Sequence, residues 1–443
     1  MSPAGRVAVL IVVGALAACD PGGVSPAPPA PDASAALPPQ GGSVVMGVFG
    51  EPASFDPRSP LASDLTFALA RPLYRSLYRF APDGGAVPDL ARSIRPVPGG
   101  VRVELSDARW SDGRPITARD VLTSIRRGHP RSGLAGVSAV ARGGTAVVLT
   151  GDVPDWEDAL ARLTFVLPAD GRRAYSGPYR VASRTEGLQI VLRPNPGAET
   201  PPLLDRLTVQ FTEGLDMLLG LLDRGRIDVA WLPSGLNLDQ RLEELGLEYA
   251  DALGWEHVFI DMRTSELEQG LRKVIATGLD RGAIEKGFVR ADGRTADTLG
   301  PGPGRGGASG PFEAVFRGGG GGGGGASVTL GAPSGDELLE LTQRMVQVQL
   351  DGAGFDVDLI NVDARRFYGE WQRANPLDLA LRRRGGAPGV PVDARRGLLQ
   401  ELPLFHVETV MAWAPGIGGI DVNGTLDGPL WDAHEWFVAD EEG

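Results

Sequence analysis

The sequence predicts an α/β fold of more than one domain, and three observations carry that prediction. The chain has 443 residues, of which 42% are apolar, enough for sizeable cores in about two or three domains. In the first half, turn signals separate short alternating runs, which is typical of antiparallel hairpins. In the second half, strand-like and helix-like runs alternate, which is typical of parallel strands joined by helices.

Hairpins dominate the first half of the predicted fold. Gly143 and Gly144 separate two strand-like runs and predict a turn between them. Thr117 followed by Asp120 is a capping-box pattern, which predicts a helix over residues 118–127. The predicted strands of this half are Val44–Phe49, Val101–Leu105, Val137–Ala141, Thr145–Thr150, Tyr179–Ser183 and Leu188–Leu192.

Alternating strands and helices follow. Leucines from Leu215 to Leu222 recur at helical spacing between two strand patterns. A second helix, which we expect to be capped by Ser334 and Glu337 and to end near Gly352, connects two further strands as a βαβ unit. The predicted strands of this half are Leu207–Phe211, Ile227–Trp231, Val328–Leu330 and Phe355–Ile360.

A glycine-rich segment interrupts this pattern. From Pro301 to Gly325, sixteen of twenty-five residues are Gly or Pro. Such a run cannot hold a fixed backbone against its conformational entropy, so we interpret it as a flexible surface insertion or a locally faulty gene model. Gly302–Gly307 fits Gly-x-Gly-x-x-Gly literally, but no strand precedes it and no helix opens at its end, so a disordered linker is the better interpretation.

Charge and motif content argue against several functions. With 43 basic and 56 acidic residues the net charge is -13, so the chain lacks the cationic excess that nucleic-acid binding needs. The sequence contains no His-Glu-x-x-His, no Gly-x-Ser-x-Gly and no P-loop pattern. We therefore expect no enzyme activity, no metal and no cofactor. Structural or surface roles are expected for the four histidines, which are His129, His257, His406 and His434.

The N-terminus has the pattern of an exported protein. Residues 1–18 carry one charge, at Arg6, and an apolar stretch too short to span a bilayer, as in a signal peptide. It ends in Leu-Ala-Ala before Cys19, the single cysteine, and this resembles the bacterial lipobox. An ordinary signal peptide that abuts a cysteine is the alternative. Residues 20–40, rich in Pro, Ala and Ser, read as a tether to the membrane surface.

A series of short motifs follows the chain from the first predicted strand onward. The most specific is Ala-Arg-Trp-Ser-Asp-Gly-Arg-Pro-Ile-Thr-Ala-Arg-Asp-Val, at residues 108–121. The others are Gly41–Pro57, Pro72–Tyr78, Pro88–Ala91, Ser176–Val181, Leu222–Ala230, Leu279–Arg281 and Leu402–His406. Together, in this order across roughly residues 41–437, they resemble family 5 of the solute-binding proteins of ABC importers, the peptide, nickel and opine receptors.

The resemblance implies a two-lobed fold of the type II periplasmic binding proteins, with a hinge and an extra subdomain in the first lobe. Ligand would bind between the lobes, which close around it and dock on an ABC permease, and the protein would be a monomer. The implied domains are a signal peptide 1–18, a lipidated Cys19 with tether 19–40, a first lobe 41–235 with a subdomain at about 53–170, a second lobe 236–400 including the insertion 301–325, and a return to the first lobe over 401–443.

Candidate ligand contacts come from aromatic residues near predicted strand ends and from a run of arginines. Trp231, Trp255 and Trp413 are the first candidates, and Phe55 and Tyr74 follow the same logic near the first strand; core packing is the alternative for each. Where peptide receptors of this family carry a Trp and sometimes an acid, this chain has basic residues and appreciably fewer residues before Leu402. Those residues, Arg382, Arg383 and Arg384, could favour an anionic ligand or form a solvated basic turn.

Three functional hypotheses follow. The first is a lipid-anchored receptor that binds oligopeptides or a similar solute for an ABC importer at the outer face of the cell membrane. The second is a divergent member of the family that no longer transports and acts as an extracytoplasmic sensor or interaction protein. The third, an exported enzyme, is disfavoured by the missing catalytic motifs.

Overall fold

The computed structural model describes residues 38–129, 132–232, 238–263, 265, 267–286, 325–363, 366–367, 371, 376–384 and 400–439. The predicted signal peptide, Cys19, the tether up to residue 37 and the insertion 301–324 lie outside these residues. Within the described residues, no helix has both the length and the apolar character needed to cross a membrane.

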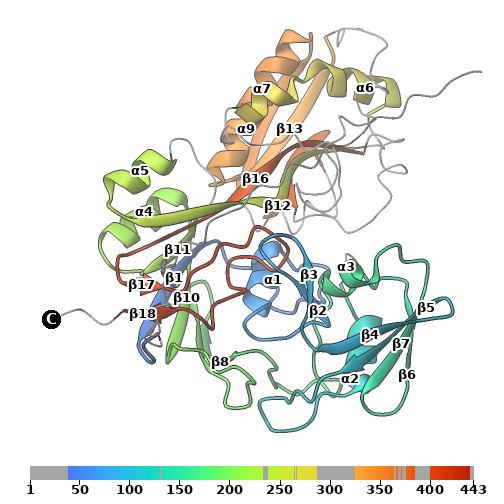
Figure 1. Cartoon of the computed structure of the whole chain (residues 1–443). Helices are drawn as coiled ribbons and strands as arrows, with labels where there is room; N and C mark the ends of the chain where they lie inside the picture. Colours follow the sequence, from blue (N-terminus) through green and yellow to red (C-terminus); the bar gives the residue numbers. More distant parts are fainter. Residues whose placement is uncertain are drawn as a thin grey trace, which may run out of the picture. The chain divides into compact units, whose positions relative to one another are not determined.

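A mixed sheet of ten strands forms the framework (Figure 1). Its order is β14-β13-β15-β12-β16-β11-β1-β10-β9-β8. β1 is parallel to β10 and β11, and β13 is parallel to β14 and β15, while the other pairs are antiparallel. This confirms the predicted α/β class. The bounds are β1 Ser43–Phe49, β8 Tyr179–Thr185, β9 Gln189–Pro194, β10 Arg206–Thr212, β11 Val229–Leu232, β12 Glu248–Met262, β13 Ser327–Ser334, β14 Asp356–Asp363, β15 Leu379–Arg384 and β16 Glu401–Trp413.

The first lobe contains β1, β8, β9, β10 and β11, and apolar residues cover both faces of its sheet. Alternation along β1 places Val44 and Val48 on one face and Val45 and Phe49 on the other. Helices α4 (Leu215–Asp223) and α5 (Leu238–Glu244) pack over the second face. Helix α1 (Asp64–Ala70) and the chain after β16 pack over the first, and the latter contains β17 Ile417–Gly418 and β18 Phe437–Val438.

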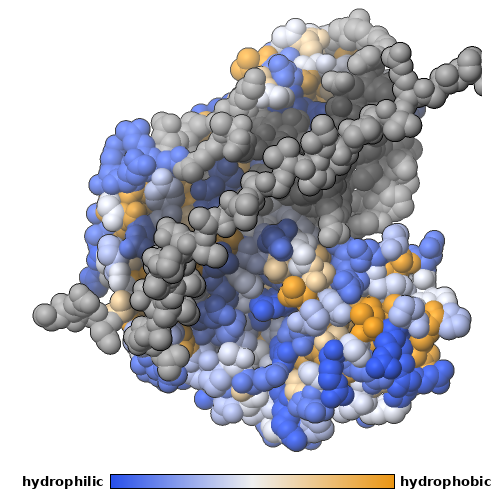
Figure 2. All heavy atoms as spheres, in the orientation of Figure 1, coloured by the Kyte–Doolittle hydropathy of each residue, from blue (hydrophilic) through white to orange (hydrophobic). Residues whose placement is uncertain are grey.

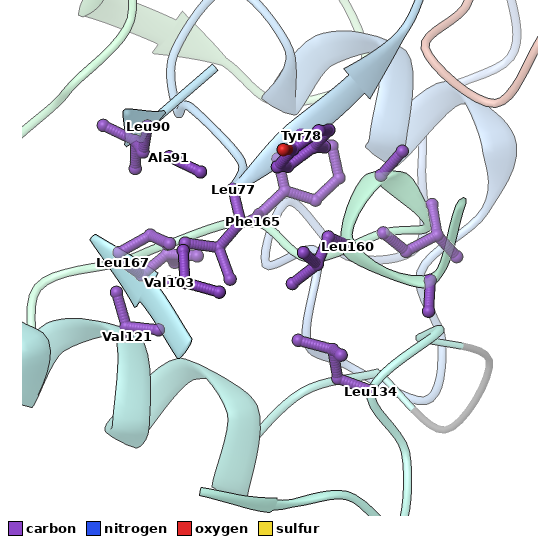
Figure 3. Close-up of a cluster of buried hydrophobic side chains, with 14 of the residues drawn as sticks. Leu77, Tyr78, Leu90, Ala91, Val103, Val121, Leu134, Leu160, Phe165 and Leu167 are labelled. Atoms are coloured by element: carbon purple, nitrogen blue, oxygen red, sulfur yellow. The ribbon is translucent and has the colours of Figure 1, made fainter. Parts of the chain in front are cut away.

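An inserted subdomain has its own core within the first lobe. Four antiparallel strands in the order β4-β5-β7-β6 pack with the hairpin β2–β3 and the helices α2 and α3. In Figure 3 the side chains of Leu77, Val103, Leu160 and Phe165, from separate segments, turn toward one cluster. The predicted hairpins and the Thr117 capping box are confirmed. The bounds are β2 Tyr78–Phe80, β3 Ala86–Pro88, β4 Ala91–Val97, β5 Gly100–Leu105, α2 Ala118–Arg126, β6 Ser138–Ala141, β7 Ala146–Thr150 and α3 Trp156–Ala161.

The second lobe is built on the predicted βαβ unit. Helix α9 (Glu337–Gly352) connects the parallel strands β13 and β14, and α6 (Gln269–Gly278) and α7 (Arg281–Lys286) pack beside it. The predicted N-cap was wrong by two residues. Asp336, not Ser334, caps α9, because β13 continues to Ser334 and the Asp336 side chain accepts from Leu339 N at 3.2 Å.

Strands β12 and β16 belong to both lobes. They are 15 and 13 residues long and pair antiparallel from Glu248 and Trp413 at one end to Asp261 and Glu401 at the other. Near Trp413 β16 joins the first-lobe strand β11, and near Asp261 β12 joins the second-lobe strand β15. In the part of the chain that the structure describes, the sheet therefore continues from one lobe to the other through β12 and β16.

The exposed surface carries few large apolar side chains. Figure 2 shows the hydrophobic residues of one face in small groups separated by hydrophilic ones. Scattered apolar residues of this kind are normal on a protein surface and do not by themselves mark an interface. The described large apolar residues that are exposed are Leu61, Val140, Leu188, Met217 and Val348.

Candidate functional site

The parallel strands of the first lobe end together at one edge of the sheet. In register, Phe49 of β1 lies beside Thr212 of β10, and Val48 lies beside Trp231 of β11. Gly50 N donates to Thr212 O at 2.8 Å, which closes the end of the β1–β10 pair. Ligands of α/β proteins bind beyond the carboxyl ends of such strands, so this edge is the first half of the candidate site.

The second lobe has an edge of the same kind. Ser334 and Asp363 are register partners at the carboxyl ends of β13 and β14. Gly335, at φ +83°, then turns the chain into α9, and its N–H donates to Glu340 Oε1 at 2.8 Å. Only a residue without a Cβ adopts this backbone conformation at no cost, so the turn explains the glycine.

The two edges come close together at Gly335. A Cβ placed on Gly335 would lie 3.5 Å from the carbonyl oxygen of Glu213, the residue that follows β10. The loop after β13 therefore approaches the loop after β10. The candidate site is the region where the carboxyl ends of the two sets of parallel strands meet.

Phe55 lies at the first-lobe edge. Its ring centroid is 6.1 Å from that of Phe211 in β10, and the Arg184 guanidinium carbon lies 4.0 Å from its centre. Arg184 also donates to Glu51 Oε1 at 2.8 Å, which fastens the loop after β1 to the β8–β9 hairpin. Phe55 is half-buried between these groups, so its position suits the site and its contacts are structural.

Tyr74 lies deeper in the first lobe. It packs against both the subdomain core and the core under β1, with its ring centroid 5.7 Å from that of Tyr175. Burial raises the pKa of the Tyr74 hydroxyl far above its ordinary value, so it stays protonated. These contacts are those of a core residue.

Trp231 and Trp413 share a face of the sheet but occupy opposite ends of β11. Trp413 is the register partner of Val229, where β11 begins, and Trp231 is one residue from where β11 ends. The indole N–H of Trp413 donates to Glu248 Oε2 at 2.9 Å. Of the two tryptophans, only Trp231 lies at the carboxyl edge.

Trp255 does not lie at a strand end, as expected from the sequence, but within β12. It is 6% exposed and packs with the subdomain core, its ring 4.5 Å from Phe80 between centroids. The Arg162 guanidinium carbon lies 5.8 Å from the centre of its ring. Trp255 is thus fixed to the first lobe at the point where the chain crosses to the second.

The three arginines lie on β15 rather than in a turn. Arg382 is buried, donates to Asp261 Oδ2 at 3.1 Å, and has its guanidinium carbon 5.1 Å from the centre of the Phe367 ring. Arg383 donates to Asp336 Oδ2 at 3.2 Å. Arg384 ends the strand. A solute anion at Arg382 or Arg383 would compete with a carboxylate that is already in place.

A buried polar network in the first lobe was not found by sequence reasoning. The Arg71 guanidinium pairs with Asp427 and donates to Ser76 Oγ at 3.1 Å, and Asp427 also accepts from Phe80 N. Burial raises the pKa of the Asp427 carboxyl above its ordinary value, while Arg71 opposes that shift. The partners are 356 positions apart in the chain, so no local signal could have paired them.

A small pocket with a volume of about 10 Å³ lies elsewhere, in the inserted subdomain. Its walls come from α2, from the loop around Leu134 and from residues 163–166, and are mostly apolar. None of the aromatic residues predicted from the sequence lines it. Strand topology therefore locates the candidate site better than this pocket does.

Among the described residues no three acidic, histidine or cysteine side chains are gathered as metal ligands.

Comparison with known proteins supports the same fold. The oligopeptide-binding protein AppA from Bacillus subtilis, in complex with a nonapeptide, is 19% identical with a TM-score of 0.71, over 91% of this chain and 100% of AppA. The binding protein AgaA from A. tumefaciens R10, in complex with agropinic acid, is 18% identical with a TM-score of 0.73, over 90% and 99%. The Escherichia coli murein tripeptide binding protein MppA is 15% identical with a TM-score of 0.72, over 92% and 100%.

The family assignment comes from the sequence. No curated protein matches the chain. The model of the bacterial extracellular solute-binding proteins, family 5 Middle, matches residues 85–401, which is more than half of the chain. That family consists of extracytoplasmic substrate receptors and not of enzymes. With the two-lobed α/β fold in agreement, the chain belongs to family 5 of the bacterial extracellular solute-binding proteins.

Proposed function

We propose that this chain is the lipid-anchored solute receptor of an ABC importer, and that it binds an oligopeptide or a similar small solute between its lobes. The observation that carries the proposal is the approach of Gly335 to Glu213, which brings the carboxyl ends of both sets of parallel strands to one place. The lobes would close around the solute and deliver it to the permease.

The ion pairs on β15 refine the expected ligand. Arg382 and Arg383 are engaged by Asp261 and Asp336, so they supply less net positive charge than three consecutive arginines suggest. A neutral or zwitterionic solute such as a peptide fits this balance better than a polyanion, because it need not displace a carboxylate.

Native mass spectrometry of the protein, purified without denaturation, tests the binding function. A mass that co-purifies and is released on unfolding would support it and would distinguish a ladder of peptides from a single solute. An empty protein that also shows no rise in melting temperature with peptide, opine and metal-chelate pools would contradict it. The alternative, a sensor that no longer transports, would then lead.

A matched pair of variants tests where the solute binds. Trp231→Ala changes the carboxyl edge, whereas Trp413→Ala changes the same face at the other end of β11. We expect Trp231→Ala to abolish retention of the co-purifying mass and Trp413→Ala to retain it, although both lower stability. Equal retention by the two variants would place the solute elsewhere.

A separate variant tests the lipid anchor. Cys19→Ser should move the protein from the membrane fraction to the soluble fraction.

A further inference from the structure

The pairing of β12 with β16 shifts register at two places, and the larger shift lies between Leu253 and His257 of β12. Pairing runs without a shift from Glu248 opposite Trp413 to Leu253 opposite Glu408, and resumes with His257 opposite His406. Three residues of β12 therefore face a single residue of β16, Val407. A bulge of this kind bends the strand and weakens its pairing locally.

The hydrophobic cores change at the same place. On β12, Trp255 packs in the first-lobe subdomain, whereas Val258, Ile260 and Met262 pack in the core of the second lobe. On β16, Val407 still belongs to the second-lobe core, and Val410 already belongs to the first lobe. The boundary between the lobes thus falls within two or three residues of the bulge on each strand.

Trp255 is fastened to the first lobe on the near side of this boundary. Its backbone N–H donates to Gly424 O at 2.6 Å, and its ring lies against Phe80. The segment that holds Gly424 is itself fixed, because Asn423 Nδ2 donates to Phe80 O at 3.1 Å and Asn423 Oδ1 accepts from Thr425 N at 2.8 Å. Asn423 is 0% exposed.

Gly254 allows β12 and β16 to approach each other closely. A Cβ on Gly254 would lie 2.3 Å from Val407 O and 3.3 Å from Thr409 Oγ1. Its backbone is not in the left-handed region, so the contact rather than the conformation excludes a side chain. Any larger residue must push β12 away from β16 at the bulge.

We propose that these contacts form a clamp that makes Trp255 the fixed end of the hinge. The clamp consists of Phe80, Gly254, Trp255 and the segment 423–425. It holds β12 to the first lobe as far as Trp255, so the second lobe rotates about the peptide units between Trp255 and His257 and beside Val407. The inference rests on the proposed receptor function, and it gives Trp255 a role in lobe movement rather than in ligand contact.

The distance between the lobes, measured by pulsed electron spin resonance without added solute, tests the clamp. With Cys19→Ser no native cysteine remains, so Leu188→Cys in the first lobe and Val348→Cys in the second take the two spin labels. Both positions are well exposed, at 49% and 70%. The labelled chain is compared with and without a further change, Gly254→Ala or Asn423→Ala.

We expect both changes to displace or broaden the distance distribution, because each loosens the fixed end of the hinge. Gly144→Ala, where an added Cβ meets nothing within 4 Å, is the control and should leave it unchanged. Circular dichroism confirms folding, and Asn423→Ala decides the test if Gly254→Ala does not fold. Distributions that superimpose on the parent for every folded variant would overturn the clamp.

The clamp and the receptor function can fail separately. The spin-label experiment requires no solute, so a response to Gly254→Ala or Asn423→Ala would support the hinge even if native mass spectrometry finds the protein empty. A bound solute together with an unchanged distance distribution would support the receptor function and remove Trp255 from the hinge.

Discussion

Arg71 and Asp427 form a buried ion pair that joins the end of α1 to the segment that follows β16. Their side chains are 5% and 1% exposed, and the Arg71 guanidinium carbon lies 4.6 Å from the centre of the Phe165 ring. Removal of one partner of such a pair leaves a buried charge without compensation, which is far more costly than removal of both.

Arg71→Met should therefore destabilise the protein by about 3–5 kcal/mol in urea unfolding. The double variant Arg71→Met with Asp427→Asn should lose less than the sum of the single variants, since no uncompensated charge remains. The Arg71→Met defect should also shrink as the pH falls. Arg71 opposes the burial that raises the pKa of Asp427, so without it the carboxyl protonates more readily in the folded state. Additive single effects would contradict this account.

Asp432 should make the folded protein less stable as the pH rises. Burial raises the pKa of its carboxyl to about 7, although Asp421 N and the Trp436 indole N–H both donate to it. Between the ordinary pKa and this value the folded state holds a proton that the unfolded state releases. The stabilisation that protonated Asp432 gives to the folded state is therefore fully present below about pH 4. It is lost as the pH rises to about 7, and the loss is roughly 4 kcal/mol at most.

Asp432→Asn removes that dependence, because the amide does not titrate. At pH 5 we expect the variant to be less stable than the parent by about 1 kcal/mol, because its hydrogen bonds are imperfect. By pH 8 the parent has lost stability and the variant has not, so the difference should shrink or reverse. Urea unfolding at both pH values measures the change. Asp112→Asn is the control, since Arg114 holds the pKa of that exposed carboxyl below its ordinary value and it stays charged throughout. Parallel pH profiles for Asp432→Asn and the parent would refute the assignment.

Asp120→Ala should cost about 2 kcal/mol of stability. One carboxylate oxygen accepts from Thr117 N at 2.9 Å and from Thr117 Oγ1 at 2.8 Å, and the other accepts from Ala169 N at 2.9 Å. The change removes the cap of α2 and releases the chain at Ala169. Thr123→Ala in the same helix removes only an exposed bond to Arg119 O and should stay within about 0.5 kcal/mol. Equal losses for the two variants would show that the cap is not the cause.

Local patterns in the sequence predicted the elements well, because their signals lie within one turn or one helix. The hairpin at Gly143 and Gly144, the capping box at Thr117 and the βαβ unit around α9 are examples. Ser334 and Asp336 are both good cap residues, and the length of β13, which tertiary pairing sets, decided between them.

The site was harder to predict, because it depends on contacts between distant segments. The sequence placed Trp255 near a strand end, whereas β12 runs through Gly254 and Trp255 as a bulged strand paired with β16. The arginines of β15 looked available in sequence, and their partners Asp261 and Asp336 come from other elements. Which of Trp231 and Trp413 lies at the carboxyl edge could not be decided until the register between β11 and β16 was known.

Gly177→Ala tests whether the Ser-Gly-Pro-Tyr motif is structural. A Cβ on Gly177 would lie 2.4 Å from Pro72 O, and the same stretch is bonded to the chain after α1, with Gly177 N donating to Leu73 O at 2.9 Å. The added methyl group must push these segments apart, which should cost about 1–3 kcal/mol. Gly144→Ala meets no atom within 4 Å and should be nearly neutral. Thermal unfolding of both variants measures the difference. If Gly177→Ala instead leaves stability intact and abolishes retention of a co-purifying solute, the motif would belong to the binding site and not to the scaffold.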